Sequence, residues 1–368
     1  MKLRYKILLG VGILIVGAVG SMAVVMSHTS PCDASPAGAT GPGLMKAVVR
    51  RCYGSPEVVR YENIPKPSPG DHQILVKVHA ASVNPLDWHD MEGIPYLVRL
   101  DAGLGSPKDL RLGVDYAGTV ESVGPNVKRF KPGDEVFGGK SGALAEYVLV
   151  NEDRAITLKP GNVTFEQAAA VPVAAITALQ ALRDKGQLKP GQRVLVNGAS
   201  GGVGTFAVQI AKALGADVTG VCSTKNVDLV RSLGADHIID YTREDFTQNG
   251  QHYDLILDTV ETHSLWAYKR ALTPDGAYVM VGSTTPYKWF GFLAKPIGAL
   301  LISPFTKQKV KLILAELSRQ DLDTIAAWMQ SGKVVPVIDR TFKLPEAAKA
   351  LSYLERGHAR GKVVVTVE

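Results

Sequence analysis

A glycine-rich segment at 198–204, Gly-Ala-Ser-Gly-Gly-Val-Gly, has the composition of a turn that binds phosphate groups. The apolar run Val194–Val196 before it predicts a β-strand, and the amphipathic run Thr205–Leu214 after it predicts a helix. In such a unit, glycine lets phosphates approach the backbone, and the free N–H groups at the helix N-terminus attract their negative charge. The segment therefore predicts a binding site for a dinucleotide diphosphate. The contacting residues would be Ser200, Gly201, Gly202, Val203 and Gly204.

Other phosphate-binding loops fit this segment less well. A nucleoside-triphosphate loop of the G-x-x-x-x-G-K-[ST] kind ends in a Lys-Ser/Thr pair, which is missing here. Ala199 stands where the common G-x-G-x-x-G pattern has its first glycine, so the strand–turn–helix context carries the prediction. A glycine-rich turn of another α/β protein, such as one that binds S-adenosylmethionine, stays open as an alternative.

The next predicted strand, Asp217–Cys222, is followed by residues that suit a 2′-phosphate. Dinucleotide folds that bind NAD place an Asp or Glu after this strand, where it binds the ribose 2′-hydroxyl. Here the segment reads Ser223-Thr224-Lys225, and two hydroxyls and an ammonium suit an additional phosphate instead. The prediction is therefore NADPH rather than NADH, and a solvated helix start is the alternative interpretation.

Further strand-like runs recur at the spacing of βαβ units, and they predict a doubly wound parallel sheet. These runs are His237–Ile239, Leu255–Asp258 and Ala277–Val281. Gly282 follows the last run, at the sheet edge where a nicotinamide ring would lie. Residues 46–150 differ, because their strand-like runs alternate with Pro/Gly turns, which is typical of an all-β module.

Five segments together match one known family. They are 81–88 (Ala-Ser-Val-Asn-Pro-Leu-Asp-Trp), 113–118 (Gly-Val-Asp-Tyr-Ala-Gly), 133–138 (Gly-Asp-Glu-Val-Phe-Gly), the turn at 198–204, and 361–365 (Gly-Lys-Val-Val-Val). Over about residues 45–368, the chain resembles the medium-chain dehydrogenase/reductase superfamily, in its zinc-independent branch of quinone oxidoreductases and enone reductases.

The resemblance implies an α/β fold in which a Rossmann-type doubly wound sheet is inserted into a GroES-like β-barrel domain. It places an N-terminal extension at 1–44, the GroES-like substrate domain at 45–165 plus 321–368, and the NADP-binding domain at 166–320. It also implies a homodimer.

No metal site is expected. In the superfamily's zinc alcohol dehydrogenases, a Cys stands where this chain has Asn84, and a His where it has Val114. Only three cysteines are present, Cys32, Cys52 and Cys222, and they predict neither a C-x-x-C motif nor a disulfide framework.

The missing zinc ligands constrain the predicted chemistry. Oxidation of a simple alcohol needs a stabilised alkoxide, which a Lewis-acid metal usually supplies. Hydride addition to a quinone or enone instead gives a delocalised anion that a few hydrogen-bond donors stabilise. We therefore predict NADPH-dependent reduction of a small lipophilic quinone or α,β-unsaturated carbonyl compound. The alternatives are a metal-free NADP-dependent alcohol or carbonyl dehydrogenase, and a non-catalytic NADPH-binding membrane adaptor.

The resemblance also assigns residues on the acceptor side. Asn84 lies where the family lines the nicotinamide pocket, so its amide would orient substrate or cofactor. His89 stands where several members carry Tyr, and it would donate a hydrogen bond or proton to the nascent oxyanion. A surface histidine is the alternative. Asp115 of the Gly-x-Asp motif is interpreted as structural.

On the cofactor side, the resemblance assigns Tyr241 a second contact to the 2′-phosphate. Arg360 and Lys362 are further candidates for cationic contacts, with a solvated loop as the alternative.

The N-terminal extension has the pattern of a membrane anchor. Three cations within the first six residues precede an uncharged run, Ile7–Met26, whose helix of about 30 Å would match a bilayer core. The prediction is a single-pass membrane protein anchored through residues 7–26, with a flexible linker at 27–44. Secretion after signal cleavage near 21–23 is the alternative. The orientation of the anchor stays open. The N-terminal cations predict a cytoplasmic N-terminus, which would place the enzyme domain outside the cytoplasm, whereas its predicted cofactor NADPH is cytosolic.

Charge and the remaining apolar residues add two points. The net charge of +6 includes no dense basic run, so no nucleic acid is expected as a partner. A second apolar stretch, Trp289–Phe305, is interrupted by a lysine and two prolines, and it predicts packing on the nucleotide domain or at a dimer interface. A membrane-facing lip through which a lipophilic quinone enters is the alternative.

Overall fold

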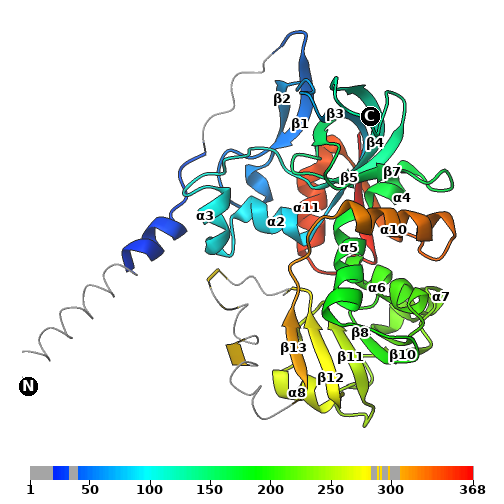
Figure 1. Cartoon of the computed structure of the whole chain (residues 1–368). Helices are drawn as coiled ribbons and strands as arrows, with labels where there is room; N and C mark the ends of the chain where they lie inside the picture. Colours follow the sequence, from blue (N-terminus) through cyan, green and yellow to red (C-terminus); the bar gives the residue numbers. More distant parts are fainter. Residues whose placement is uncertain are drawn as a thin grey trace, which may run out of the picture.

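Two β-sheets of different type lie at opposite ends of the molecule in Figure 1. The computed structural model describes residues 20–32, 40–282, 288–289, 291, 297–298 and 307–367. One sheet has six strands, all parallel. The other has seven strands and is mostly antiparallel.

The six-stranded sheet follows the order β10-β9-β8-β11-β12-β13, so the chain starts at its centre and winds to one edge before it crosses to the other. Its strands are β8 (Arg193–Asn197), β9 (Asp217–Cys222), β10 (His237–Asp240), β11 (Tyr253–Asp258), β12 (Leu272–Met280) and β13 (Lys309–Leu312). The helices between them are α6 (Gly202–Ala213), α7 (Val227–Ser232) and α8 (Leu265–Arg270). This order is that of a doubly wound Rossmann sheet, so the predicted parallel sheet is confirmed.

The seven-stranded sheet joins two segments that are far apart in the sequence, because β15 near the C-terminus pairs with β3. Its strands are β3 (Gln73–Val83), β4 (Asp115–Val123), β5 (Glu135–Gly139), β6 (Tyr147–Asn151), β7 (Ile156–Leu158), β14 (Ile338–Lys343) and β15 (Lys362–Thr366), and β1 (Leu44–Val49) pairs separately with β2 (Arg60–Pro65). The helices around it are α2 (Pro85–Glu92), α3 (Arg99–Ala102) and α11 (Ala347–Glu355). The predicted GroES-like unit built from two distant segments is therefore confirmed.

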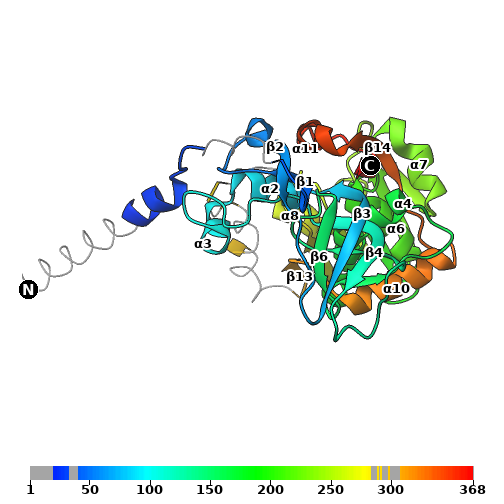
Figure 2. The same ribbon diagram turned by 90° about the horizontal axis from the view of Figure 1, so that it is seen from above.

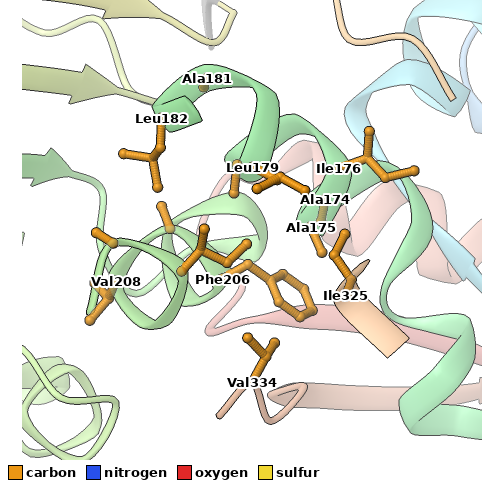
Figure 3. Close-up of a cluster of buried hydrophobic side chains, with 14 of the residues drawn as sticks. Ala174, Ala175, Ile176, Leu179, Ala181, Leu182, Phe206, Val208, Ile325 and Val334 are labelled. Carbon is orange, nitrogen blue, oxygen red and sulfur yellow. The ribbon is translucent and has the colours of Figure 1, made fainter. Parts of the chain in front are cut away.

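Helices α5 (Pro172–Gln180) and α6 pack against each other in the largest buried apolar cluster, part of which Figure 3 shows. Small alanines in α5 let the two helix backbones approach, and Phe206 of α6 fills the space between α5 and α10 (Arg319–Gln330). The cluster also contains Ala80 and Phe137 from the antiparallel sheet. One continuous core therefore holds the two sheets in a fixed relation.

Both predicted domain junctions fall within helices. The junction at 165/166 lies in α4 (Phe165–Ala169), which packs on β3 and β4, and the junction at 320/321 lies in α10, which packs on β7 and α5. These helices contact the antiparallel sheet as well as the neighbouring helices, so neither junction is an exposed linker.

The prediction of a single-pass membrane anchor at residues 7–26 was wrong. Among the described residues, no helix is long and apolar enough to cross a membrane. The described helix at 20–27 is about 12 Å long, and its Met26 is buried against the folded part of the chain. Residues 7–19 of the predicted anchor, like most of the apolar stretch at 289–305, lie outside the described residues.

The cysteines also differ from the prediction, which included no disulfide. Cys32 and Cys52 form a disulfide, whereas Cys222 is a buried free thiol. The sequence did not predict this pair, because 20 residues separate the two cysteines and no motif relates them.

Candidate active site

The glycine-rich turn between β8 and α6 leaves room for a diphosphate. A Cβ built at Gly201, the N-cap of α6, would meet only the carbonyl oxygen of Gly198, at 3.4 Å. A Cβ at Gly204 would lie 2.0 Å from that oxygen, so only glycine lets helix and turn approach this closely. The first N–H groups of α6, which begins in this turn, have no intrahelical partner and are available to an anion. The turn thus fits the diphosphate of a dinucleotide, with an open cradle at its anion-binding end.

The carboxyl ends of the parallel strands bring the predicted cofactor residues to one sheet edge. The turn at 200–204 follows β8, Ser223–Lys225 follow β9, Tyr241 follows β10 and Gly282 follows β12 closely. Gly282 is exposed and has open space around it. The Ser200 hydroxyl accepts a hydrogen bond from the buried Asn226 amide at 2.9 Å, a contact that joins the ends of β8 and β9 and that the sequence did not predict.

The region that the sequence predicts to bind the 2′-phosphate contains an acid, Asp240, that was not among the predicted residues. The Thr224 hydroxyl donates to the Asp240 carboxylate at 2.5 Å, and Thr242 donates to it as well. These hydrogen bonds, that of Thr224 foremost, hold the pKa of Asp240 below its ordinary value. Thr224 is thus engaged with a neighbouring carboxylate. Arg243 lies 3.4 Å from the same carboxylate, and it is exposed, as is Lys225.

A buried polar cluster surrounds Asn84, the residue that the sequence predicts to lie on the acceptor side. The Asn84 side chain donates to Asp115 Oδ2 at 2.9 Å and accepts from the Lys362 ammonium. Ser82 also donates to Asp115 Oδ2 at 2.9 Å, and Lys362 Nζ lies 3.4 Å from the same oxygen. Because the oxygen of Asn84 faces a cation and its nitrogen faces an anion, the orientation of its amide is fixed.

This cluster connects both units of the fold. Asp115 Oδ1 accepts from the backbone N–H of Val173 in the first turn of α5, at 2.9 Å. The Lys362 side chain passes the glycine-rich turn, since its Cδ would lie 3.4 Å from a Cβ built at Gly202. Lys362 therefore lies between the cofactor cradle and Asn84. Arg360, the other cationic candidate, has no such contact among those found in the described part of the chain.

Asp87 adds a titratable group beneath Asn84. Its carboxylate accepts from the backbone N–H of Asn84 at 2.7 Å, as part of the capping box that begins α2. Burial raises the pKa of Asp87 to about 7, and the nearby Asp115 adds to this rise, while the Asn84 N–H and Lys362 oppose it.

His89 lies apart from this cluster. Successive residues of a helix are rotated by about 100° around its axis. His89, which stands five residues after the N-cap Asn84, therefore faces a different side of α2. Its Nδ1 is buried without a hydrogen-bond partner in the described structure, and its ring lies 4.4 Å from that of Trp88. Burial lowers the pKa of His89, so the imidazole is neutral at pH 7.

The donor set does not resemble a zinc site. The side chains at 84 and 114 are an amide and an isopropyl group, neither of which is a usual zinc ligand. Within the described ranges, no group of three or more His, Cys, Asp or Glu residues could hold a metal ion.

Two family models match the chain. One describes an alcohol dehydrogenase GroES-like domain and covers residues 70–160, and the other describes a zinc-binding dehydrogenase and covers residues 233–365.

Individual proteins match over most of the chain. The trans-enoyl reductase pgmF of Aspergillus terreus is 37% identical over 327 residues, which cover 81% of this chain and 87% of that protein. The mitochondrial NAD(P)H oxidoreductase RTN4IP1 of Homo sapiens is 37% identical over 359 residues, or 88% of this chain and 89% of that protein. The solved structure of a quinone oxidoreductase from Coxiella burnetii has a TM-score of 0.76 and 30% identity, and the match covers 88% of this chain and 100% of that one.

Proposed function

Because the chain belongs to the medium-chain dehydrogenase/reductase superfamily, in its zinc-independent quinone and enone reductase branch, we propose that it reduces quinones or α,β-unsaturated carbonyl compounds with NADPH. NADPH, when bound, supplies a hydride to the acceptor. The protein binds both molecules, orients them and stabilises the negative charge that develops on the acceptor oxygen.

The contact of Lys362 with both the glycine-rich turn and Asn84 is the observation that carries this proposal. Through Lys362, the glycine-rich turn that would hold the cofactor is connected to the fixed amide of Asn84 on the proposed acceptor side, and neither Lys362 nor Asn84 is a usual metal ligand. Asn84 uses one N–H on Asp115, so its second N–H is the donor we propose for the acceptor or the carboxamide of the nicotinamide. Lys362 and Asp115 hold that amide in one orientation.

We assign the proton of the product to a separate group. His89 is neutral and half-buried, and its enclosed Nδ1 has no hydrogen-bond partner in the described structure, so a donor role requires the ring to turn toward the acceptor. A neutral imidazole N–H donates to a developing enolate or hydroquinone oxygen at pH 7. We propose His89 for this role because the resemblance places it where several members of the superfamily carry Tyr, although it faces a different side of α2 from Asn84.

The preference for NADPH rests on the cations after β9 and β10. Ser223, Lys225 and Tyr241 are the proposed contacts to the 2′-phosphate, and Arg243 joins them because it lies at the same edge. Thr224 contributes indirectly, since its hydroxyl binds Asp240.

Two further features remain proposals. The unit boundaries 45–165 plus 321–368 and 166–320 are supported by the two-sheet topology, and the homodimer is supported by the family resemblance alone. Light scattering coupled to size-exclusion chromatography of the full chain tests the dimer.

The first experiment follows NADPH oxidation at 340 nm by the full chain with a panel of quinones and enones. We expect turnover with NADPH, little turnover with NADH, and no effect of a chelator. Tight NADPH binding without turnover of any acceptor would instead identify a non-catalytic binding protein. Chelator-sensitive oxidation of alcohols would contradict the proposal.

A further inference from the structure

The N-terminal strap, residues 20–32, lies against the acceptor side of the fold. Figures 1 and 2 both show its helix beside α3. Met26 of the strap is buried, and Thr29 forms an isolated β-bridge with Gly105, where the Ser30 N–H donates to the Gly105 carbonyl at 2.8 Å. The strap is therefore docked through backbone contacts as well as through an apolar side chain.

Arg99 is the centre of this contact. Its side chain is buried, with 2% of its surface exposed, and it makes five hydrogen bonds to neutral oxygens. Three of the five acceptors belong to the strap: the carbonyls of Met26 and His28 and the hydroxyl of Thr29. A buried cation needs all of its acceptors, so removal of the strap would leave much of the guanidinium unsatisfied.

The other two acceptors of Arg99 belong to the end of α2. They are the carbonyls of Glu92 and Gly93, at 3.2 and 2.8 Å. Gly93 ends α2 in a left-handed conformation, and a Cβ there would collide with both Tyr53 and Arg99. Arg99 thus connects the strap to the helix that carries His89 and is capped by Asn84.

The same segment also contacts the nucleotide-binding unit. The Tyr96 N–H donates to the carbonyl of Lys288 at 2.8 Å, and the Tyr96 ring lies 4.8 Å from that of Trp289. The Arg99 guanidinium lies 4.8 Å from the centre of the Tyr96 ring. Displacement of Arg99 would therefore loosen a contact between the two sides of the site.

The disulfide closes the strap onto this region. Cys32 is exposed at the end of the strap, and Cys52 is buried beside Tyr53, whose hydroxyl donates to the Gly103 carbonyl at 2.8 Å. Gly54 donates to the Met91 carbonyl of α2 at 3.2 Å. The covalent bond thus joins the two chain segments that flank the Arg99 contacts.

We propose that the N-terminal strap is a functional part of the acceptor site, in which Arg99 is a positioning residue for α2 and the Cys32–Cys52 disulfide is a thiol-sensitive lock. The inference rests on the proposed function, because it assigns α2 to the acceptor side. Opening the lock lowers the fraction of molecules with a docked strap, and it weakens acceptor reduction without weakening NADPH binding.

The lock opens by thiol–disulfide exchange. A thiolate of a low-molecular-weight dithiol attacks the exposed Cys32 sulfur, the S–S bond breaks, and Cys52 leaves and takes up a proton. The second thiolate of the reagent then displaces Cys32, so the protein gains two thiols and the reagent becomes a cyclic disulfide. Glutathione disulfide reverses the reaction and is itself reduced to two glutathione thiols.

The test compares the oxidised full chain with the same protein reduced by dithiothreitol. The measurements are kcat/KM for a quinone or enone, the Kd of NADPH from cofactor fluorescence, and hydrogen exchange in residues 86–105. On reduction, we expect a three- to tenfold fall in kcat/KM, a change in the NADPH Kd below twofold, and faster exchange in 86–105. Recovery of activity with glutathione disulfide is also expected.

Matched variants separate the contributions. The double variant C32S/C52S should behave like reduced protein and should not respond to dithiothreitol, which controls for the free Cys222 thiol. R99M should lower kcat/KM in either redox state, R99K should restore part of it, and R231M on the exposed face of α7 should have no effect.

The outcomes distinguish the two levels of the proposal. If oxidised protein turns over no acceptor, the proposed function fails. If it turns over an acceptor and reduction, C32S/C52S and R99M all leave kcat/KM unchanged, the inference is overturned while the proposed function stands. A loss of NADPH affinity equal to the loss of kcat/KM would also overturn it, because that result indicates general unfolding.

Discussion

Lys362 Nζ and Asp115 Oδ2 lie 3.4 Å apart, and the two side chains are 3% and 0% exposed. A buried ion pair of this kind adds little net stability, because desolvation offsets much of the attraction between the charges. Here the ion pair fixes the orientation of the Asn84 amide, because both of its members form hydrogen bonds with that amide.

Removal of one charge from this ion pair should destabilise the folded protein. Lys362→Met leaves Asp115 buried without its cation, so we expect the free energy of unfolding to fall by about 3–5 kcal/mol. The double variant K362M/D115N removes both charges and should recover part of that loss, which denaturant unfolding of both proteins would measure. Equal stability of K362M and wild type would show that the pair does not matter for folding.

The buried Asp87 predicts a pH-dependent stability. Burial raises its pKa from an ordinary value of 3.8 to about 7, so between these pH values the folded state binds more protons than the unfolded state. Stability from this group is present below about pH 4 and is lost as the pH rises through 7, with a slope approaching 1.4 kcal/mol per pH unit.

The variant Asp87→Asn tests this prediction, because asparagine keeps an oxygen that accepts from the Asn84 N–H. We expect D87N to remove most of the slope between pH 4 and 7, as measured by urea unfolding at several pH values. A slope unchanged in D87N would assign the pH dependence to other groups.

Selectivity for NADPH should depend on two exposed cations. The double variant K225A/R243A removes the ammonium after β9 and the guanidinium after β10, so we expect the KM for NADPH to rise about tenfold. The KM for NADH should change by less than twofold, because NADH has no 2′-phosphate. The exposed Lys349 on α11 provides the control, as K349A should leave both constants unchanged.

The parts of the fold that the sequence predicted depend on local patterns. Apolar runs and glycine-rich turns define β8 to β12 and the start of α6, and parallel topology then brings the predicted cofactor residues to one edge. The helix begins at Gly202 rather than at the predicted Thr205, because the last glycines of the turn adopt helical geometry.

Contacts between distant segments were not predictable in this way. Lys362 and Asn84 are separated by 278 residues, and no periodicity relates them. The same holds for Cys32 with Cys52, and for Arg99 with the strap. An apolar run of the right length predicted a membrane helix at 7–26, but length and hydropathy could not reveal that Met26 is buried on the folded chain.

His89 provides the most direct test of the proposed chemistry. Removal of its N–H in His89→Phe should lower kcat for enone or quinone reduction about 100-fold, since positioned proton donors contribute on this order. His89→Gln keeps an N–H donor and should retain part of the activity, while the Kd of NADPH should be unchanged in both variants. Because burial lowers the pKa of His89, its imidazole stays neutral, and the wild-type kcat should be flat between pH 7 and 9. Stopped-flow measurement of NADPH oxidation at saturating acceptor gives these values, and an H89F variant with wild-type kcat would transfer the role of proton donor to solvent or to another residue.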